Sequence, residues 1–293
     1  MLARSTALAV ACGLLLTLAA PAAVAPGSAK VASVSEPSGG PACLPGEAFE
    51  NDEVRLWFQG LKAHVVVEDK REGASYVYQS AWLAELAADG TELRTMHIGH
   101  AFPHESTCSV TETEDGVVLS ITITEDVREA QGGSVGLGTV ELRYAFNASG
   151  LGTKFDLVVH AWPWADGAAD HVLAYDFDVA SAQLTMESAD NGIGLRNSTG
   201  DKTGYVEWAR NATATYDDSS QAEANVTSTS EGTDHERHVR LTFANVAGGY
   251  AGLLLDPWVG LGDWIIVAGQ LIGLGPAEGL LPDAARDLVG RVL

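Results

Sequence analysis

Alternating apolar and polar positions recur along most of the chain and predict β-strands. The clearest example is the segment 109–124, in which two alternating runs flank an Asp-Gly pair at 115–116. Asp-Gly between such runs is typical of the tight turn of a β-hairpin, and the alternation places Leu119, Ile121 and Ile123 on one face. The segment therefore predicts an antiparallel hairpin with one buried face.

Similar alternation appears at residues 54–58, 140–146, 173–179 and 239–243, and Gly-containing turn signals separate the runs. About a dozen short strands over some two hundred residues are typical of two packed antiparallel sheets. We therefore expect an all-β protein, with a two-sheet β-sandwich or jelly roll over residues 49–256.

The last segment, residues 257–293, changes character. Its apolar run at 264–275 is shorter than the roughly twenty residues that cross a bilayer. The run favours a buried helix or a final strand, and contact of this segment with a membrane surface is the alternative. The spacing of Ala285, Leu288 and Val292 predicts a short C-terminal amphipathic helix.

The beginning of the chain has the pattern of a secretory leader. Arg4 precedes an apolar run at 7–20, and small residues follow it. This order predicts a signal peptide over residues 1–25, although the exact cleavage position stays open. Residues 26–48 are rich in Pro, Gly and Ser and predict a flexible tether.

The chain is strongly acidic, with 39 Asp and Glu against 17 Lys and Arg and a formal net charge of -22. A protein of this charge repels nucleic acids and anionic membrane surfaces, which argues against both as partners. The acidity is most simply that of a solvated surface.

Four N-glycosylation sequons agree with the predicted leader. Four of the seven asparagines are followed by the acceptor pattern: Asn147, Asn197, Asn211 and Asn225. Ser and Thr frequency alone would give about one such pattern. Because a sequon is used only on the exposed surface of a secreted protein, we expect an exterior or cell-surface location, with all four side chains facing solvent.

Removal of the leader removes Cys12 and leaves Cys43 and Cys108 as the only cysteines. In an oxidising compartment, an isolated pair is most simply one disulfide. The predicted bond would tie the start of the domain to its interior.

A cluster of histidines, His97, His100 and His104 with the adjacent Glu105, offers the most specific candidate chemistry. Neutral imidazoles gathered in a loop are suitable ligands for zinc or copper. The spacing matches no strict metal-binding motif, so exposed loop histidines are the alternative.

Trp162 and Trp164 flank Pro163 and form a second candidate site. Aromatic faces on a rigid loop stack on sugar rings or on an apolar partner surface. Tryptophan is also an ordinary core residue, and the alternating run that leads into this motif favours burial of one of the two indoles.

Residues 154–164 and 255–260 resemble segments of uncharacterised secreted archaeal β-sandwich proteins. The resemblance covers two short motifs, Lys-Phe-Asp-Leu-Val-Val-His-Ala-Trp-Pro-Trp and Leu-Asp-Pro-Trp-Val-Gly. It implies a β-sandwich fold and an external location, and it carries no catalytic residues.

Together these patterns predict an extracytoplasmic, N-glycosylated, acidic domain that binds a protein or glycan at the cell surface, or is displayed there, without catalysis. Two alternatives stay open. The first is a secreted metal-binding protein or enzyme that uses the loop of His97, His100 and His104. The second is a carbohydrate-binding module that uses Trp162 or Trp164.

Overall fold

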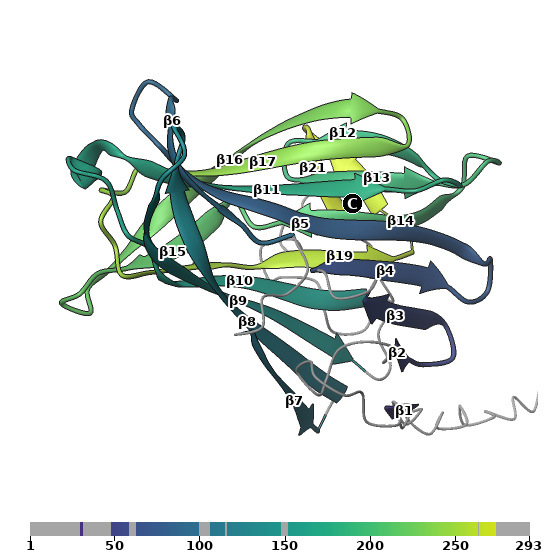
Figure 1. Cartoon of the computed structure of the whole chain (residues 1–293). Helices are drawn as coiled ribbons and strands as arrows, with labels where there is room; N and C mark the ends of the chain where they lie inside the picture. The colour runs from purple at the N-terminus through teal and green to yellow at the C-terminus, as the bar shows by residue number, and fades with distance from the viewer. Residues whose placement is uncertain are drawn as a thin grey trace, which may run out of the picture.

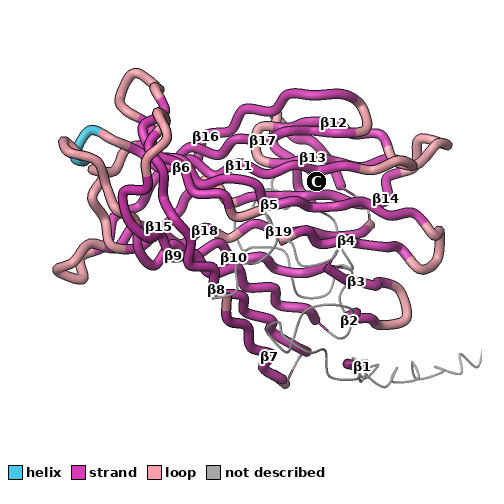
Figure 2. The backbone as a smooth tube through the Cα atoms, viewed as in Figure 1, coloured by secondary structure: helices cyan, strands magenta, loops and turns pink. Residues whose placement is uncertain are grey.

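The computed structural model describes a protein built almost entirely from antiparallel β-strands (Figure 2). The described residues are 30–31, 48–58, 63–99, 106–114, 116–147, 152–262 and 264–273. Within them, the short 3-10 helix η1 (Ala168–Asp170) is the single helical element. The predicted all-β, antiparallel class is confirmed. No helix in these ranges combines the length and the hydropathy that spanning a membrane requires.

Ten strands are hydrogen-bonded in a closed ring (Figure 1). Each strand pairs antiparallel with the next, and the last pairs with the first. In ring order they are β5 (Ala74–Leu86), β11 (Val172–Ala180), β17 (Glu236–Ala244), β16 (Gln221–Thr233), β15 (Asn211–Thr215), β18 (Gly252–Leu255), β10 (Gly152–Ala161), β9 (Ser134–Asn147), β8 (Gly116–Glu129) and β6 (Glu92–His97).

Two arms of further strands extend from the ring. The first arm pairs with β5 and consists of β4 (His64–Asp69), β3 (Val54–Phe58), β2 (Ala48–Glu50) and β1 (Lys30–Val31). The second arm pairs with β10 and consists of β19 (Pro257–Leu261), β14 (Lys202–Trp208), β13 (Gly192–Arg196) and β12 (Thr185–Ala189). The strand β7 (Thr107–Thr113) is added to β8.

The ring corrects the prediction of two separate sheets. Within the described residues, nineteen strands form one continuous sheet because β5 and β10 each change partners along their length. Residues 74–79 of β5 pair with β4, whereas residues 82–86 pair with β6, and a bulge interrupts the register with β11 between the two halves. A bulge bends its strand and increases the local twist, which allows the sheet to close on itself.

The two arms, with the ring strands that carry them, face each other across one core (Figure 1). Aromatic contacts join the facing strands: the ring centroids of Phe58 and Tyr144 are 5.3 Å apart, and those of Phe177 and Trp208 are 5.8 Å apart. The predicted hairpin at 109–124 is confirmed as β7 and β8, and Leu119, Ile121 and Ile123 are buried as expected. The alternation therefore identified the inward face correctly.

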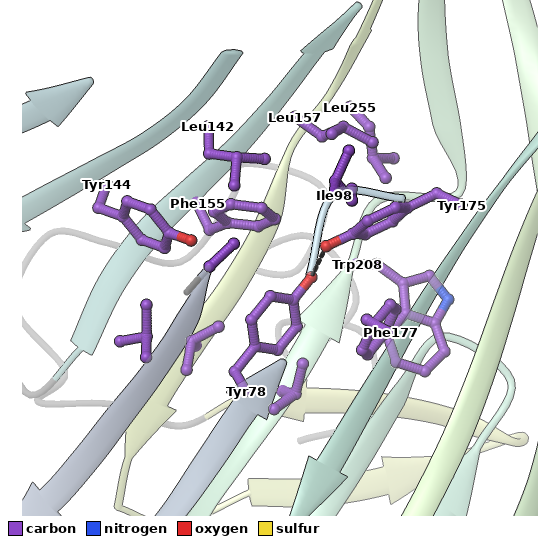
Figure 3. Close-up of a cluster of buried hydrophobic side chains, with 14 of the residues drawn as sticks. Tyr78, Ile98, Leu142, Tyr144, Phe155, Leu157, Tyr175, Phe177, Trp208 and Leu255 are labelled. Atoms are coloured by element: carbon purple, nitrogen blue, oxygen red, sulfur yellow. Dashed lines mark hydrogen bonds between the residues drawn. The ribbon is translucent and has the colours of Figure 1, made fainter. Parts of the chain in front are cut away.

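Three buried hydroxyl groups within this core, those of Tyr78, Ser80 and Tyr175, are hydrogen-bonded to one another. The hydroxyl of Tyr175 lies 2.8 Å from that of Tyr78 and 2.7 Å from that of Ser80, among buried aromatic and aliphatic side chains (Figure 3). Burial raises the pKa of both phenols, so they remain neutral hydrogen-bonding groups. A buried hydroxyl without a partner would cost stability, and this network avoids that cost.

The apolar run near the C-terminus forms a hairpin of β20 (Trp264–Val267) and β21 (Gln270–Gly273). Of the two predicted alternatives, the strand is confirmed and the buried helix is wrong. The hairpin packs on β13 and β14, where Trp264 and Leu271 are fully buried. The amphipathic helix predicted from residue 285 onward lies outside the described residues.

At the other end of the chain, the predicted signal peptide (1–25) also lies outside the described residues. Part of the predicted tether is described by the structure. Lys30 and Val31 form β1, which pairs with Phe49 and Glu50 of β2. Ala48, the first residue of β2, pairs with Trp57. Three described positions of the segment 26–48 are therefore held by backbone pairing.

Candidate functional site

The loop that contains Trp162 and Trp164 follows β10 and lies against β5 and β9 of the ring. Trp162 is buried, and its ring lies against β9 at Gly138, where an added Cβ would be 3.6 Å from the indole and 2.8 Å from the sulfur of Met96. The distance to the indole is an ordinary contact, whereas the distances to Met96 and to Val127, at 2.9 Å, show that the glycine leaves space for those two side chains. A ring buried in this way has no free face for a ligand, so the ligand platform predicted at Trp162 is not available in this structure.

Trp164 remains partly exposed and is held by a neighbouring loop. Its Nε1–H donates to the carbonyl oxygen of Tyr250 at 3.1 Å, and its ring meets the Tyr250 ring edge to face at 4.8 Å. Such an arrangement fixes the orientation of the indole. Ligand stacking therefore stays a prediction for Trp164 alone.

Glu85 anchors the loop from below and is the most heavily hydrogen-bonded acidic side chain of this region. The carboxylate is fully buried and accepts from Trp162 Nε1–H at 3.0 Å, from the backbone N–H of Ala165 at 3.0 Å, and from His171 Nδ1–H at 2.7 Å. Because a carboxylate only accepts, the proton lies on Nδ1 of His171 in this contact. Glu85 thus joins three points of the segment 162–171 to β5.

Sequence reasoning missed Glu85 and His171. The available signal was a single acidic residue within an apolar strand, Trp82-Leu-Ala-Glu-Leu86, which indicates either an exposed position or a buried charge with partners. Glu85 and His171 are 86 positions apart, so no local sequence pattern could indicate that they form a hydrogen bond.

The predicted histidine site is only partly described. His97 lies at the end of β6, and its ring meets the ring of Trp82 edge to face at 4.0 Å on the outer surface of the ring of strands. His100, His104 and Glu105 lie outside the described residues. Among the residues that are described, no group of three or more His, Cys, Asp or Glu side chains is arranged to hold a metal ion. Zinc or copper binding stays a prediction.

The sequon asparagines lie at strand ends, within a strand and in a turn. Asn211 begins β15, Asn225 lies in β16, and both side chains are exposed, which confirms the predicted solvent access for these two. Asn197 is partly exposed in the turn between β13 and β14, where its Oδ1 accepts from the hydroxyl of Thr199 at 2.7 Å. Asn147 is the last residue of β9, and the remainder of its sequon lies outside the described residues.

The predicted disulfide leads to a measurable expectation. Cys108 lies in β7 opposite Ile121 and packs partly buried against the core, whereas Cys43 lies outside the described residues. A bond between them closes a loop of about 65 residues and is expected to contribute about 3–4 kcal/mol. Intact-mass measurement of the mature protein, with and without reductant and alkylation, should show two thiols only after reduction. Two thiols that alkylate without reduction would contradict the bond.

Glu207 is an ionisable group at the contact between the C-terminal hairpin and the sheet. Its carboxyl lies on β14 under β21, 3.3 Å from the backbone N–H of Gly273 and 3.5 Å from Nδ2 of Asn191. Burial raises the pKa of Glu207 from 4.5 to about 7. The hairpin therefore covers a carboxyl group that holds its proton near neutral pH.

We expect this group to make stability depend on pH. A raised pKa of an acid means that the folded state binds the proton more tightly than the unfolded state does. The contribution of Glu207 to the free energy of unfolding is therefore fully present below about pH 4.5 and is lost as pH rises through 7. The total change in the free energy of unfolding is about 3 kcal/mol. Thermal unfolding of the wild type and Glu207→Gln between pH 4.5 and 8.5 tests this. The wild type should lose stability relative to the variant as pH rises, and parallel profiles would contradict the assignment.

Comparison with known proteins adds no relationship: no model of a protein family matches the chain, and no similar sequence is found among characterised proteins.

Proposed function

We propose that this protein is an extracytoplasmic, N-glycosylated, acidic domain that binds a protein or glycan partner at the cell surface and does not itself catalyse a reaction. The observation that carries the proposal is the exposure of Asn211 and Asn225 on the outer surface of the ring. Acceptor asparagines buried in the core could not be modified in the folded protein.

The distribution of side chains supports an external site of action. The inner face of the ring is filled by apolar and aromatic residues, including Tyr78, Phe155 and Phe177. A partner therefore meets the outer surface, which carries most of the charged residues. With a net charge of -22, that surface favours a neutral or cationic partner over nucleic acid.

Mass spectrometry of the protein secreted by its own cells tests the proposal. Trypsin releases the peptide 197–202, which carries Asn197, and the peptide 211–237, which carries Asn211 and Asn225. We expect glycan masses on these peptides and a mature N-terminus that lacks the leader. Thr199→Ala should remove the modification from Asn197, whereas Thr199→Ser keeps a sequon and should retain it.

An unprocessed leader, retention inside the cell, or unmodified asparagines on all of these peptides would contradict the proposal.

A further inference from the structure

Asn211 and Asn225, fourteen positions apart in the sequence, lie directly opposite each other on the neighbouring strands β15 and β16. Both side chains are exposed, and residues directly opposite in an antiparallel pair point to the same face. Two sequons that look independent along the chain therefore share one small area of the surface.

The hydrogen bonding of the neighbouring pair defines how close the two asparagines are. The backbone N–H of Val226 donates to the carbonyl oxygen of Arg210 at 2.6 Å, so Arg210 and Val226 form a hydrogen-bonded pair. Hydrogen-bonded and non-hydrogen-bonded pairs alternate, which makes Asn211 and Asn225 a non-hydrogen-bonded pair with Cα atoms about 4.5 Å apart. This is the closer of the two antiparallel arrangements.

The remainder of each sequon lies on the same face. Thr213 and Thr227 are two residues after their asparagines and share their direction. Because the strands are antiparallel, the two threonines lie on opposite sides of the asparagine pair. An enzyme that recognises either sequon must therefore cover the other asparagine.

We propose that Asn211 and Asn225 act as a single glycosylation site, in which a glycan on either asparagine prevents modification of the other. This inference rests on the proposed N-glycosylation of the protein. In the transfer, Nδ2 of one asparagine forms a bond to the anomeric carbon of a glycosyl phosphate donor. The bond from that carbon to the phosphate oxygen breaks, its electron pair leaves with the phosphate, and Nδ2 gives one proton to a base of the transferring enzyme.

The physical reason is exclusion of volume at the second asparagine. The first sugar ring is attached directly to Nδ2 and lies over a partner whose Cβ is about 5 Å away. Neither the transferring enzyme nor a second sugar ring can occupy that space. On its other side, Asn225 lies opposite Ala244 of β17, whose methyl group leaves the remaining surface open to the first glycan.

The tryptic peptide 211–237 provides a direct test, because no Lys or Arg separates the two sequons and one peptide carries both. Its mass shows how many glycans one molecule bears at the pair. In the natively secreted protein we expect the singly glycosylated peptide and loss of the doubly glycosylated form. A doubly glycosylated peptide as frequent as the product of the two separate occupancies would overturn the inference.

Single-sequon variants supply the second measurement. Thr213→Ala should raise the occupancy of Asn225, and Thr227→Ala should raise that of Asn211, whereas Thr213→Ser, which keeps the sequon, should leave both unchanged. Thr199→Ala serves as a distant control that should not alter this peptide. Unchanged occupancy in both alanine variants would overturn the inference.

The outcomes separate this inference from the proposed function. Glycan on Asn197 with an unmodified peptide 211–237 overturns the inference and leaves the proposed function standing. Absence of glycan from Asn197, Asn211 and Asn225 together overturns both.

Discussion

Replacing Glu85 by Ala is expected to lower the free energy of unfolding by about 3–5 kcal/mol, because breaking a buried ionic hydrogen-bond cluster leaves its other members without a partner. Trp162 Nε1–H, the backbone N–H of Ala165 and His171 Nδ1–H would each lose their acceptor. The substitution also leaves a cavity beneath the loop. A loss of this size is a large part of the total stability of an ordinary domain.

Chemical denaturation, followed by circular dichroism, measures this loss. Glu85→Gln keeps the shape and one acceptor oxygen, so it should destabilise less than the alanine variant. Trp162→Phe removes one donor and should cost about 1 kcal/mol in hydrogen bonding, beyond any change in packing. A change of less than about 1 kcal/mol in Glu85→Ala would show that the carboxylate does not hold the loop.

Replacing Gly194 by Val is expected to displace the C-terminal hairpin from the sheet. A Cβ at this position would lie 2.3 Å from a ring carbon of Trp264, a distance that requires the indole to move. The indole is held from several directions, since its Nε1–H donates to the Leu195 carbonyl at 3.3 Å and Arg196 lies 4.6 Å from the ring centroid. Loss of this buried tryptophan contact should cost about 3–5 kcal/mol.

Hydrogen exchange distinguishes this local effect from general unfolding. Exchange at residues 264–273 should accelerate in Gly194→Val, while the core strand β11 should remain protected as long as the domain stays folded. Trp264→Ala in the same background should remove most of the additional cost, because the clash then has no partner. Gly133→Val is a matched control, since a Cβ there meets nothing within 4 Å, and its stability should change by less than about 0.5 kcal/mol. Equal stabilities for the two valine variants would contradict the role of Gly194.

The alternation of apolar and polar positions determined the local structure of this protein. It identified the hairpin of β7 and β8, the inward faces of β3, β11 and β17, and the antiparallel class. These features depend on neighbours within a few positions of the sequence. Alternation of apolar and polar residues with a period of two indicates a β-strand that has one buried face. The sequons were equally local, so their four positions could be read directly.

The closed ring depended on pairing between strands that are distant in the sequence, which no local pattern predicts. The first half of β5 alternates and buries Tyr76 and Tyr78, whereas the second half, residues 82–86, is nearly all apolar. The first half pairs with β4 and the second with β6, and the change of partner occurs at a bulge opposite Asp176 and Phe177, which the residues of β5 alone do not predict. The apolar run at 264–275 was compatible with a helix or a strand. It became a hairpin because Gly192 and Gly194 leave space on the sheet for Leu271 and Trp264.

The candidate sites divide in the same way. The sequence identified Trp162 and Trp164 as a pair, and the tertiary structure separated them, because only Trp162 is buried, with its Nε1–H donating to the carboxylate of Glu85. The sequence also identified Asn211 and Asn225 as separate acceptors, and strand pairing brought them face to face. The sequence by itself thus determined which residues are candidates and how they are spaced along the chain. Which of these residues lie close together was decided by pairing between distant strands, because that pairing depends on the free energy of the whole fold.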